Sequence, residues 1–423
     1  MSIIDKGITS PMHAGGLNMS VNVVIVGGGF GGLETALSLK NLLQSSVRIT
    51  LVDKSEYHSF MPSIHEIISG KILTRDIQIP LSLVLGIAGI EFVHDMVLSV
   101  DLTNNQVITS SQSLNFDYLV LASGAENNFY DVKGAEIFAH RFRSPDDAER
   151  IHADLEVLLN QRDERRSVII AGGGTEGIEV AGEVFDMITE RDFARDLTSG
   201  RISLEIIQAQ DELLPGFPAK VQKFAKEYLL GKGVTIVTGN RIVEVQQSSV
   251  ILESGMARDM SMLIWTGGIQ PAKLIRELPL TKDPQGWLRV TDRLHSPDDG
   301  RIYGVGDIIS MYADEKPLAL SRLAYHALDQ AVIASINIYN HLRGRKQIGY
   351  APKAKPQLIS IGKDTGIFVR KDGYLSGQWV VFLKKALQAK HLMTYLTKPT
   401  VSTLTSKVPG AEFRHLLRLL SPR

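Results

Sequence analysis

The sequence predicts an α/β fold with two Rossmann-like dinucleotide-binding domains. Two glycine-rich loops, within residues 23–34 and 168–179, lead to this prediction, because each lies between a short apolar run and a helical pattern. In a G-x-G-x-x-G loop the first glycine makes a tight turn and the second lets the backbone approach a pyrophosphate. The third allows the helix to pack closely on the strand. Two such loops, 145 residues apart, predict two separate nucleotide sites.

Three glycines in each loop are the candidate pyrophosphate-binding and packing positions. They are Gly27, Gly29 and Gly32 in the first loop and Gly172, Gly174 and Gly177 in the second. A pyrophosphate bound there lies at a helix N-terminus, where free N–H groups and the helix dipole favour negative charge. Two dinucleotides on one chain indicate electron transfer between them, most simply from nicotinamide to flavin.

Two apolar runs near the first loop predict further strands of the same domain. The run 47–53 ends at Asp53, 26 residues beyond the first loop glycine, which makes Asp53 a candidate for binding an adenosine ribose. The alternative is a surface carboxylate at a strand end. The run 118–124 ends in small residues, and we expect Ala122 and Gly124 to let the backbone approach the cofactor.

Two later strand patterns also end in small residues. Residues 302–307 end in Gly306 and Asp307, and a carboxylate there can accept hydrogen bonds from sugar-like hydroxyls such as a flavin ribityl chain. The run 263–268 ends in Gly267 and Gly268, at the strand end where α/β sheets bind ligands. Either ending, taken alone, could be an ordinary turn.

Composition narrows the class of protein. Apolar residues make up 44% of the chain and charged residues 22%, which is ordinary for a globular protein. Basic and acidic residues balance at 46 each, so overall charge does not indicate nucleic-acid binding. The chain has no cysteine, which excludes thiol–disulfide chemistry and cysteine-ligated metals, and no metal site is predicted. Apolar runs are too short to predict a transmembrane helix, and residues 1–20 are expected to form a flexible extension.

The motifs together resemble those of a known superfamily. Besides the two loops, they comprise residues 57–66, 122–124, 213–217, 265–268 and 304–307 and a basic C-terminal tail. The chain resembles the pyridine-nucleotide–disulfide reductases and, among them, the type II NADH dehydrogenases, which are single-subunit NADH:quinone oxidoreductases. This resemblance implies an FAD-binding domain of residues 20–145 and 280–345, with an NAD(P)H-binding domain of residues 146–279 inserted in it. It also implies hydride transfer from NAD(P)H to FAD and electron transfer to a membrane quinone.

The resemblance assigns roles to three residues. Pro62 matches the residue that packs near the isoalloxazine ring, and Glu179 matches a residue near the nicotinamide carboxamide. A plainer interpretation of Glu179 is a carboxylate favoured by the helix dipole. NADH-using relatives usually end the strand at 202–208 with a carboxylate that repels a 2′-phosphate, whereas this chain has Gln208. NADPH is therefore admissible beside NADH.

The predicted acceptor side departs from the family pattern. Relatives with quinone activity carry two glutamines in the helix after the Gly-Asp pair, and the matching positions here are Tyr325 and Asp329. We expect Tyr325 to stack on a quinone ring and Asp329 or His326 to exchange protons. The alternative is a helix that only packs its small face on the flavin.

The C-terminal tail predicts association with a membrane surface. From Lys384 onward there are eight basic residues and one acidic residue, so the tail is +7. Apolar residues at helical spacing form two stripes, one at Phe413, Leu416, Leu417 and Leu420 and an earlier one at Leu383, Ala386, Leu387 and Met393, flanked by Lys384, Lys385 and Lys390. Basic amphipathic helices of this kind lie in the lipid interface. We therefore expect residues 346–423 to form a membrane-association or dimer region of a peripheral homodimer on the cytoplasmic face of the cell membrane.

Alternative functions differ in the electron acceptor. One is a soluble NAD(P)H-dependent reductase of a small electron-carrier protein such as a ferredoxin or rubredoxin, which would not need the basic tail. Another is a flavin redox sensor whose shape change matters more than turnover. A sulfide:quinone oxidoreductase is disfavoured because its mechanism requires cysteines.

Overall fold

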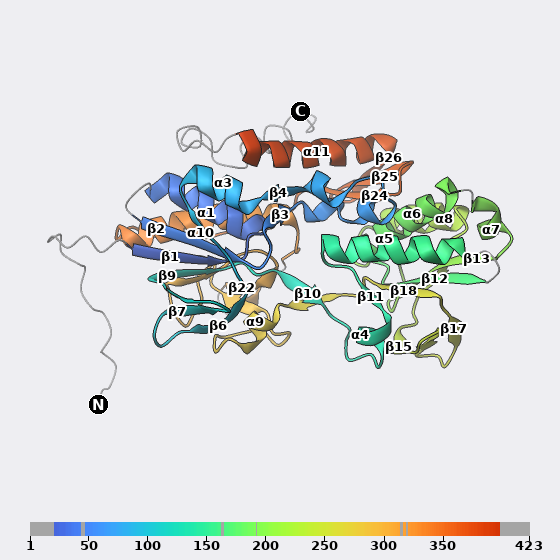
Figure 1. Ribbon diagram of the computed structural model, residues 1–423, viewed down its shortest axis with the longest axis horizontal. Coiled ribbons are helices and arrows are strands. Elements are labelled where there is room, and N and C mark those ends of the chain that lie inside the picture. The colour runs from blue at the N-terminus through green and yellow to red at the C-terminus, as the bar shows by residue number, and fades with distance from the viewer. Residues whose placement is uncertain are drawn as a thin grey trace.

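The computed structural model describes residues 21–43, 47–161, 165–191, 193–313, 316–318 and 320–397. Two α/β halves lie side by side, and the last described helix crosses above them (Figure 1). Each half is built around its own five-stranded sheet.

The first sheet is parallel and has the order β21-β9-β1-β2-β5. Its strands are β1 (Val21–Val26), β2 (Val47–Asp53), β5 (Glu91–His94), β9 (Tyr118–Leu121) and β21 (Ile302–Gly304). On one face lie α1 (Phe30–Leu43), α3 (Leu81–Ala88) and α10 (Ala324–Leu342). The other face is covered by two small sheets, β6 (Val97–Asp101), β7 (Gln106–Thr109) and β8 (Ser113–Asn115), and β20 (Leu288–Val290), β22 (Ile309–Ala313) and β23 (Lys316–Pro317), with α9 (Lys273–Glu277) beside them. Both faces are covered, which suits the buried apolar stretch of β1 from residue 23 to 26 and the all-buried β9.

The second sheet repeats this plan in the order β11-β18-β12-β13-β14, again with parallel pairing. Its strands are β11 (His140–Arg141), β12 (Arg166–Ala171), β13 (Ile202–Ile207), β14 (Thr235–Val237) and β18 (Met262–Trp265). Its helices are α4 (Ala135–Phe138), α5 (Pro145–Asn160), α6 (Thr175–Glu190), α7 (Ala194–Thr198) and α8 (Ala219–Gly231). A small antiparallel sheet in the same half consists of β15 (Ile242–Val245), β16 (Ser249–Leu252) and β17 (Ala257–Asp259). In each half the glycine-rich loop follows the central strand, which confirms the predicted pair of Rossmann-like units.

The chain passes between the halves through two strands that pair with each other. β10 (Ala125–Asn127) enters the second half, β19 (Ile269–Pro271) leaves it, and the two form an antiparallel ribbon. After β19 the chain returns to the first sheet through β21. The second unit is therefore inserted in the first, as the predicted fold class requires.

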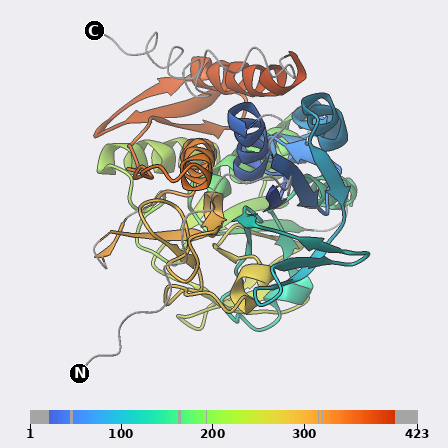
Figure 2. The same ribbon diagram turned by 90° about the vertical axis from the view of Figure 1, so that its left-hand side faces the viewer.

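The C-terminal part forms a layer above both halves. It consists of the antiparallel strands β24 (Gln357–Ile361), β25 (Thr365–Arg370) and β26 (Gly373–Gly377), followed by α11 (Gln378–Thr397). Figure 2 shows α11 above these strands. Below this layer lie β3 (Tyr57–Ser59), the short helices η1 (Met61–Ser63) and α2 (His65–Ile68), η2 (Thr74–Ile77) and β4 (Gln78–Pro80). The predicted stripe at Phe413, Leu416, Leu417 and Leu420 lies outside the described residues.

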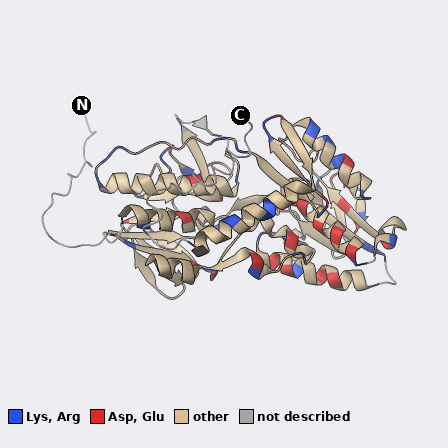
Figure 3. Ribbon diagram, turned by 90° about the horizontal axis from the view of Figure 1, so that it is seen from above, with Lys and Arg blue, Asp and Glu red and all other residues tan. Residues whose placement is uncertain are grey.

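The earlier stripe on α11 does not form a lipid-facing surface flanked by three lysines. Lys384 is buried and points into the protein, whereas Met393 is 61% exposed. The prediction was wrong for Lys384, because this side chain pairs with a carboxylate of α6. Among the described side chains of α11, the large exposed apolar ones are Trp379, Phe382 and Met393. Figure 3 shows the basic positions of this helix from above. Among the helices of the described residues, none combines the length and apolar character needed to cross a bilayer.

Candidate functional site

The first loop requires glycine at two positions and leaves open space at a third. Gly27 has a φ of +110°, and a Cβ there would lie 2.4 Å from the carbonyl oxygen of Ala122. A Cβ on Gly32 would lie 1.7 Å from the carbonyl oxygen of Gly27. A Cβ on Gly29 would meet no protein atom within 4 Å. The chain's own packing therefore fixes Gly27 and Gly32, while Gly29 leaves room for a ligand above the N-terminus of α1.

Asp53 closes the first loop from the neighbouring strand. Its Oδ2 accepts a hydrogen bond from the Gly28 N–H, and its Oδ1 accepts one from the Ser55 N–H at 2.7 Å. Burial raises the pKa of the Asp53 carboxyl, and the two N–H donors oppose that shift. The carboxylate lines the cavity beside the loop, where a ribose hydroxyl could donate to it.

A single cavity of about 1700 Å³ joins the first loop to α6, α10 and α11. It is larger than the roughly 300–1,000 Å³ of common small-molecule sites, so it has room for a dinucleotide and a further ring. The predicted site residues that line it are Gly27, Gly29, Asp53, Pro62, Ala122, Gly124, Glu179, Gly306, Asp307, Tyr325 and Asp329. The cavity therefore brings together residues that are up to 302 positions apart in the sequence.

Arg143 links the two halves at this cavity. Its Nη2 lies 2.8 Å from Oδ2 of Asp307, and its Nη1 lies 2.9 Å from Oε1 of Glu176 on α6. The Arg143 guanidinium therefore holds one carboxylate oxygen of Asp307. Sequence reasoning missed Arg143, because it lies in no glycine-rich or strand-end motif.

The second loop repeats the geometry of the first. Gly172 has a φ of +106°, and a Cβ on Gly177 would lie 1.9 Å from the carbonyl oxygen of Gly172, whereas a Cβ on Gly174 would meet nothing within 4 Å. Gln208 Oε1 accepts a hydrogen bond from the Gly173 N–H at 3.0 Å. Gln208 thus occupies the position in the second loop that Asp53 occupies in the first.

Two further glycines complete the edge of the second sheet. A Cβ on Gly172 would lie 2.8 Å from the Cα of Gly267, so these two backbones are in close contact. Gly268 has a φ of +152° and packs against Tyr130, whose hydroxyl would lie 2.1 Å from a Cβ at this position. The second-loop glycines, Gln208 and this pair do not line the large cavity, although Thr175 and Glu176 at the start of α6 do.

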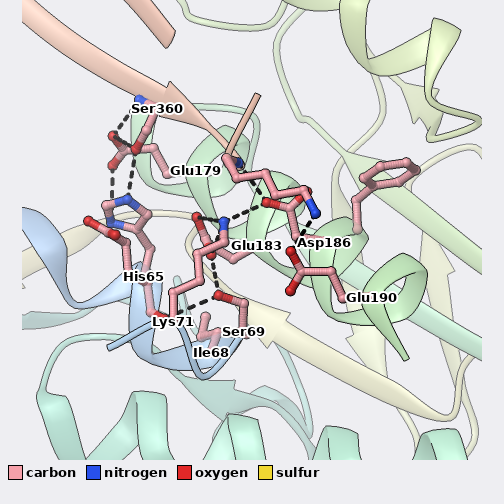
Figure 4. Close-up of polar contacts among 12 residues, drawn as sticks. His65, Ile68, Ser69, Lys71, Glu179, Glu183, Asp186, Glu190 and Ser360 are labelled. Carbon is pink, nitrogen blue, oxygen red and sulfur yellow. Dashed lines mark hydrogen bonds and ion pairs between the residues drawn. The ribbon is translucent and has the colours of Figure 1, made fainter. Parts of the chain in front are cut away.

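Glu179 lies in a buried polar group at the cavity wall (Figure 4). Its carboxylate pairs with the Lys384 ammonium and accepts the Ser360 N–H at 3.0 Å. His65 Nε2 lies 2.8 Å from Ser360 Oγ. Burial, reinforced by the nearby positive charges of Lys384 and Lys71, lowers the pKa of His65 well below its usual value, so this imidazole is neutral.

Sequence reasoning did not find the partners of Glu179. Ser360 and Lys384 follow Glu179 by 181 and 205 residues, and neither position has a local motif. His65 lay within the run 57–66 that carried the family resemblance, but nothing in that run indicated its contact with Ser360.

The predicted acceptor residues divide into two groups. Tyr325 and Asp329 line the cavity, and both contact Lys355, which forms an ion pair with Asp329 and lies 4.7 Å from the Tyr325 ring centroid. His326 is buried behind them and its Nδ1 lies 2.8 Å from the Tyr350 hydroxyl. His326 does not line the cavity, so direct proton exchange between His326 and a ligand there does not fit this geometry.

A buried histidine, His58, and a partly buried one, His391, join α11 to the first loop. His58 Nδ1 lies 3.0 Å from the carbonyl oxygen of Gly28, so Nδ1 carries the proton and donates. His58 Nε2 then accepts from His391 Nε2, 2.9 Å away. Aromatic rings of Phe30, Phe60 and Tyr395 surround the pair. Burial lowers the pKa of His58 to about 4 and that of His391 well below its usual value.

Stability should therefore fall on mild acidification. The folded protein keeps both imidazoles neutral, whereas the unfolded chain takes up protons as the pH falls below about 6.5. The contribution of the two neutral histidines to the free energy of unfolding is fully present above pH 6.5 and is lost as the pH falls towards about 4. In this range the free energy of unfolding should fall with a slope approaching about 1.4 kcal/mol per pH unit for each histidine. Urea unfolding at several pH values measures this slope. We expect His391→Phe to reduce it clearly and the exposed His94→Gln to leave it unchanged; equal slopes in all three proteins would contradict the assignment.

Comparison with protein families gives a match over most of the chain. The family model described as pyridine nucleotide-disulphide oxidoreductase matches residues 21–333. A demethylphylloquinone reductase of Synechocystis sp., NdbB, is 27% identical over 398 residues, which cover 89% of this chain and 96% of the relative. A type II NADH:quinone oxidoreductase of Staphylococcus saprophyticus is 24% identical over 381 residues, covering 87% and 94% of the two chains.

Solved structures share the fold. The sulfide:quinone oxidoreductase of Aquifex aeolicus has a TM-score of 0.81 at 21% identity, and the match covers 96% of each chain. NDH2 from Plasmodium falciparum in complex with NADH has a TM-score of 0.77 at 18% identity, covering 92% of this chain and 99% of that one. At these identities the similarity establishes the fold alone.

Proposed function

Because this chain belongs to the pyridine nucleotide-disulphide oxidoreductase family, we propose that it is an FAD-dependent NAD(P)H:quinone oxidoreductase. The observation that carries the proposal is the single cavity whose lining includes the first loop, Glu179, Tyr325 and Asp329. A donor and an acceptor could each reach one flavin in such a cavity. The names of the curated relatives support both NADH as donor and quinone as acceptor.

The residues of the first unit fit FAD. Gly29 leaves open space at a helix N-terminus for a pyrophosphate, Asp53 faces the ribose position, and Asp307 offers an acceptor for ribityl hydroxyls. Ala122, Gly124 and Pro62 line the same cavity, and we assign Pro62 to packing near the flavin ring. Bound there, a flavin would supply a two-electron relay between nicotinamide and quinone.

The protein's part in the reaction is to bind, orient and exclude water. On the donor side we assign the second-loop glycines, Gly267 and Gly268 to the nucleotide, and Glu179 to the nicotinamide carboxamide. The Lys384 ammonium and the Ser360 N–H hold the Glu179 carboxylate in place. On the acceptor side we assign Tyr325 to stacking on the quinone ring and Asp329, paired with Lys355, to a polar contact with a quinone oxygen.

The absence of cysteine separates this proposal from one rival. The Aquifex protein that shares this fold is named a sulfide:quinone oxidoreductase. The present chain has no cysteine and therefore no thiol that could form a persulfide. We further propose a peripheral homodimer on the cytoplasmic face of the membrane. The excess of basic residues after Lys384 and the exposed Trp379, Phe382 and Met393 of α11 favour a membrane quinone over a small soluble electron carrier.

Steady-state assays of the purified protein test this function. NADH and NADPH oxidation would be followed with a short-chain quinone and with ferricyanide, after acid precipitation has shown that FAD is released from the protein. Turnover with quinone supports the proposal. A flavin-loaded protein that reduces ferricyanide but no quinone would favour a protein acceptor, and one with no turnover would favour a redox sensor.

Liposome flotation tests the membrane assignment separately. A protein that ends before Pro409 should bind anionic liposomes less tightly while ferricyanide reduction continues, and high salt should weaken binding of the full chain because part of the attraction is screened. Loss of flavin on truncation would instead make the tail structural.

Gln208→Glu should shift nucleotide preference towards NADH. Gln208 holds the Gly173 N–H from the end of β13, next to the position of an adenosine ribose, so a carboxylate there would repel a 2′-phosphate. The ratio of kcat/KM for NADH to that for NADPH should rise by at least about tenfold, which corresponds to about 1.4 kcal/mol. An unchanged ratio would mean that Gln208 does not face the ribose.

A further inference from the structure

The two nucleotide units can be compared position by position, because their five-stranded parallel sheets are arranged in the same way around the strand before the loop. Leu121 of β9 pairs with Gly304, the last residue of β21, and Trp265 of β18 pairs with Arg141, the last residue of β11. Leu121 and Trp265 in turn pair with the residue that precedes each glycine-rich loop. The chain that leaves β21 in the first unit is therefore equivalent to the chain that leaves β11 in the second.

The two units differ where this chain faces the loop. Two residues beyond β21 lies Gly306, and two residues beyond β11 lies Arg143. The fifth residue of each loop, counted from its first glycine, is Gly31 in the first unit and Glu176 in the second. A Cβ on Gly31 would lie 3.7 Å from the Gly306 nitrogen, so two glycines face each other there. In the second unit an ion pair takes the same place, with Arg143 Nη1 2.9 Å from Glu176 Oε1.

Arg143 also reaches out of its own unit. Its Nη2 lies 2.8 Å from Oδ2 of Asp307, the residue that offers an acceptor for ribityl hydroxyls, and the two side chains are only 21% and 23% exposed. One guanidinium thus joins the loop that we assign to NAD(P)H to the carboxylate that we assign to the flavin. The planar fork of arginine suits this place, because its nitrogens can pair with two carboxylates at once.

The main chain is fixed at each end of this link. The Arg143 N–H donates to Oδ2 of Asp147 at 3.0 Å, beside the capped start of α5. Arg322 Nε donates to the carbonyl oxygen of Asp307 at 3.0 Å. Glu176 lies in the first turn of α6, directly after the second loop. The link therefore joins anchored segments, and its loss would let one unit shift relative to the other.

Hydride transfer depends on placement of this kind. The reacting atoms must approach to about 3–3.5 Å, and a displacement of about 1 Å can cost about 100-fold in rate. In the proposed function the second unit holds the nicotinamide and the first unit holds the flavin. Building on that function, we propose that Arg143 is a positioning residue for hydride transfer, which holds the second loop, through Glu176, against Asp307 of the flavin site.

A plainer role for Arg143 would be to attract the dinucleotide by its charge, since a pyrophosphate binds at the N-terminus of α6. Arg143→Lys distinguishes the two roles. The ammonium keeps the positive charge, but it is a point charge without the fork that pairs with two carboxylates. Attraction of the dinucleotide should therefore survive in this variant, whereas the link between the units should not.

Rapid mixing of the flavin-loaded full chain with excess NADH measures hydride transfer directly, as bleaching of the flavin absorbance without any acceptor. In Arg143→Lys we expect the bleaching rate at saturating NADH to fall at least about tenfold, and the primary isotope effect with deuterated NADH to increase. Calorimetric titration of the oxidised, flavin-loaded protein with NAD+, which cannot react, gives binding separately. The Kd for NAD+ should stay within about threefold of the wild-type value.

Glu176→Ala cuts the same link from its other end and leaves the pair of Arg143 with Asp307 in place. It removes a carboxylate from the N-terminal turn where an anion is expected to bind, so it cannot weaken binding by loss of attraction. Slower bleaching together with an unchanged or lower Kd for NAD+ is the expected result. This variant also decides the matter if Arg143→Lys does not retain flavin.

Arg276→Lys is the matched control. Arg276 pairs with Glu126 of β10 and donates to the carbonyl oxygen of Pro271 on β19, so it spans the ribbon between the units. It does not line the cavity, and its replacement should leave bleaching and NAD+ binding unchanged.

The outcomes separate this role from the proposed function. Equal bleaching rates and isotope effects in Arg143→Lys, Glu176→Ala and the wild type would overturn the positioning role. A raised Kd for NAD+ in Arg143→Lys with an unchanged bleaching rate would also overturn it and make Arg143 a phosphate contact. A flavin-loaded wild type that neither NADH nor NADPH bleaches would instead contradict the proposed function itself.

Discussion

Replacing Gly29 with alanine should give a folded protein that has lost its flavin. A Cβ at this position meets no protein atom within 4 Å, so the chain itself tolerates the methyl group. The same methyl group would occupy the space through which the backbone approaches the pyrophosphate. We expect flavin affinity to fall at least about tenfold, which corresponds to about 1.4 kcal/mol, and the purified protein to be largely colourless. Absorbance near the flavin maximum and reconstitution with FAD measure the loss.

Two other glycines provide matched controls for Gly29→Ala. Gly86, within α3, also has open space at its Cβ but does not line the cavity, so Gly86→Ala should retain flavin. Gly174→Ala makes the equivalent change in the second loop and should raise the KM for NADH while flavin content stays normal. A yellow, fully active Gly29→Ala protein would show that the first loop does not bind the pyrophosphate.

Lys384→Met should destabilise the protein strongly. The Lys384 and Glu179 side chains are only 7% and 12% exposed, and removal of the ammonium leaves the carboxylate buried without its cation. Breaking a buried pair in this way typically costs about 3–5 kcal/mol. We expect the free energy of unfolding, measured with urea, to fall by about 3 kcal/mol.

Two further proteins isolate the cause of that loss. Lys363→Met removes an exposed pair nearby and should cost less than about 1 kcal/mol. Lys384→Met combined with Glu179→Leu leaves no unpaired charge and should recover part of the stability. If Lys384→Met has the same urea midpoint of unfolding as the wild type, the ion pair does not hold α11 in place.

The two nucleotide units could be predicted from sequence because their signals are local. An apolar strand, a glycine loop and a helix follow one another within about 20 residues. The need for glycine is also partly local, because Gly27 has a positive φ and a Cβ on Gly32 would meet the carbonyl oxygen of Gly27. The strand that ends at Gln208 was identified in the same way, by its position after the second loop. The hydrogen bond that the Gln208 side chain accepts from the Gly173 N–H matches the one that Asp53 accepts from the Gly28 N–H.

The contacts of α11 could not be predicted from sequence, because they depend on residues far away along the chain. Lys384 and Lys385 are adjacent and chemically identical, yet one is buried against Glu179 while the other is 47% exposed beside Glu66. Helical spacing alone predicted that both lysines flank the apolar stripe of a basic amphipathic helix. The His58–His391 pair, 333 residues apart, has no sequence signal at all.

The antiparallel ribbon of β10 and β19 has a consequence for engineering. Because Glu126 and Gln270 face each other across it, the inserted unit begins and ends at neighbouring points of one strand pair. Segments whose two ends meet in this way are the ones that tolerate transfer between proteins. The stretch between the two strands should therefore be exchangeable as a cassette with the corresponding stretch of a relative. Such chimaeras would change the preference for the electron donor while the acceptor side remains that of the host chain.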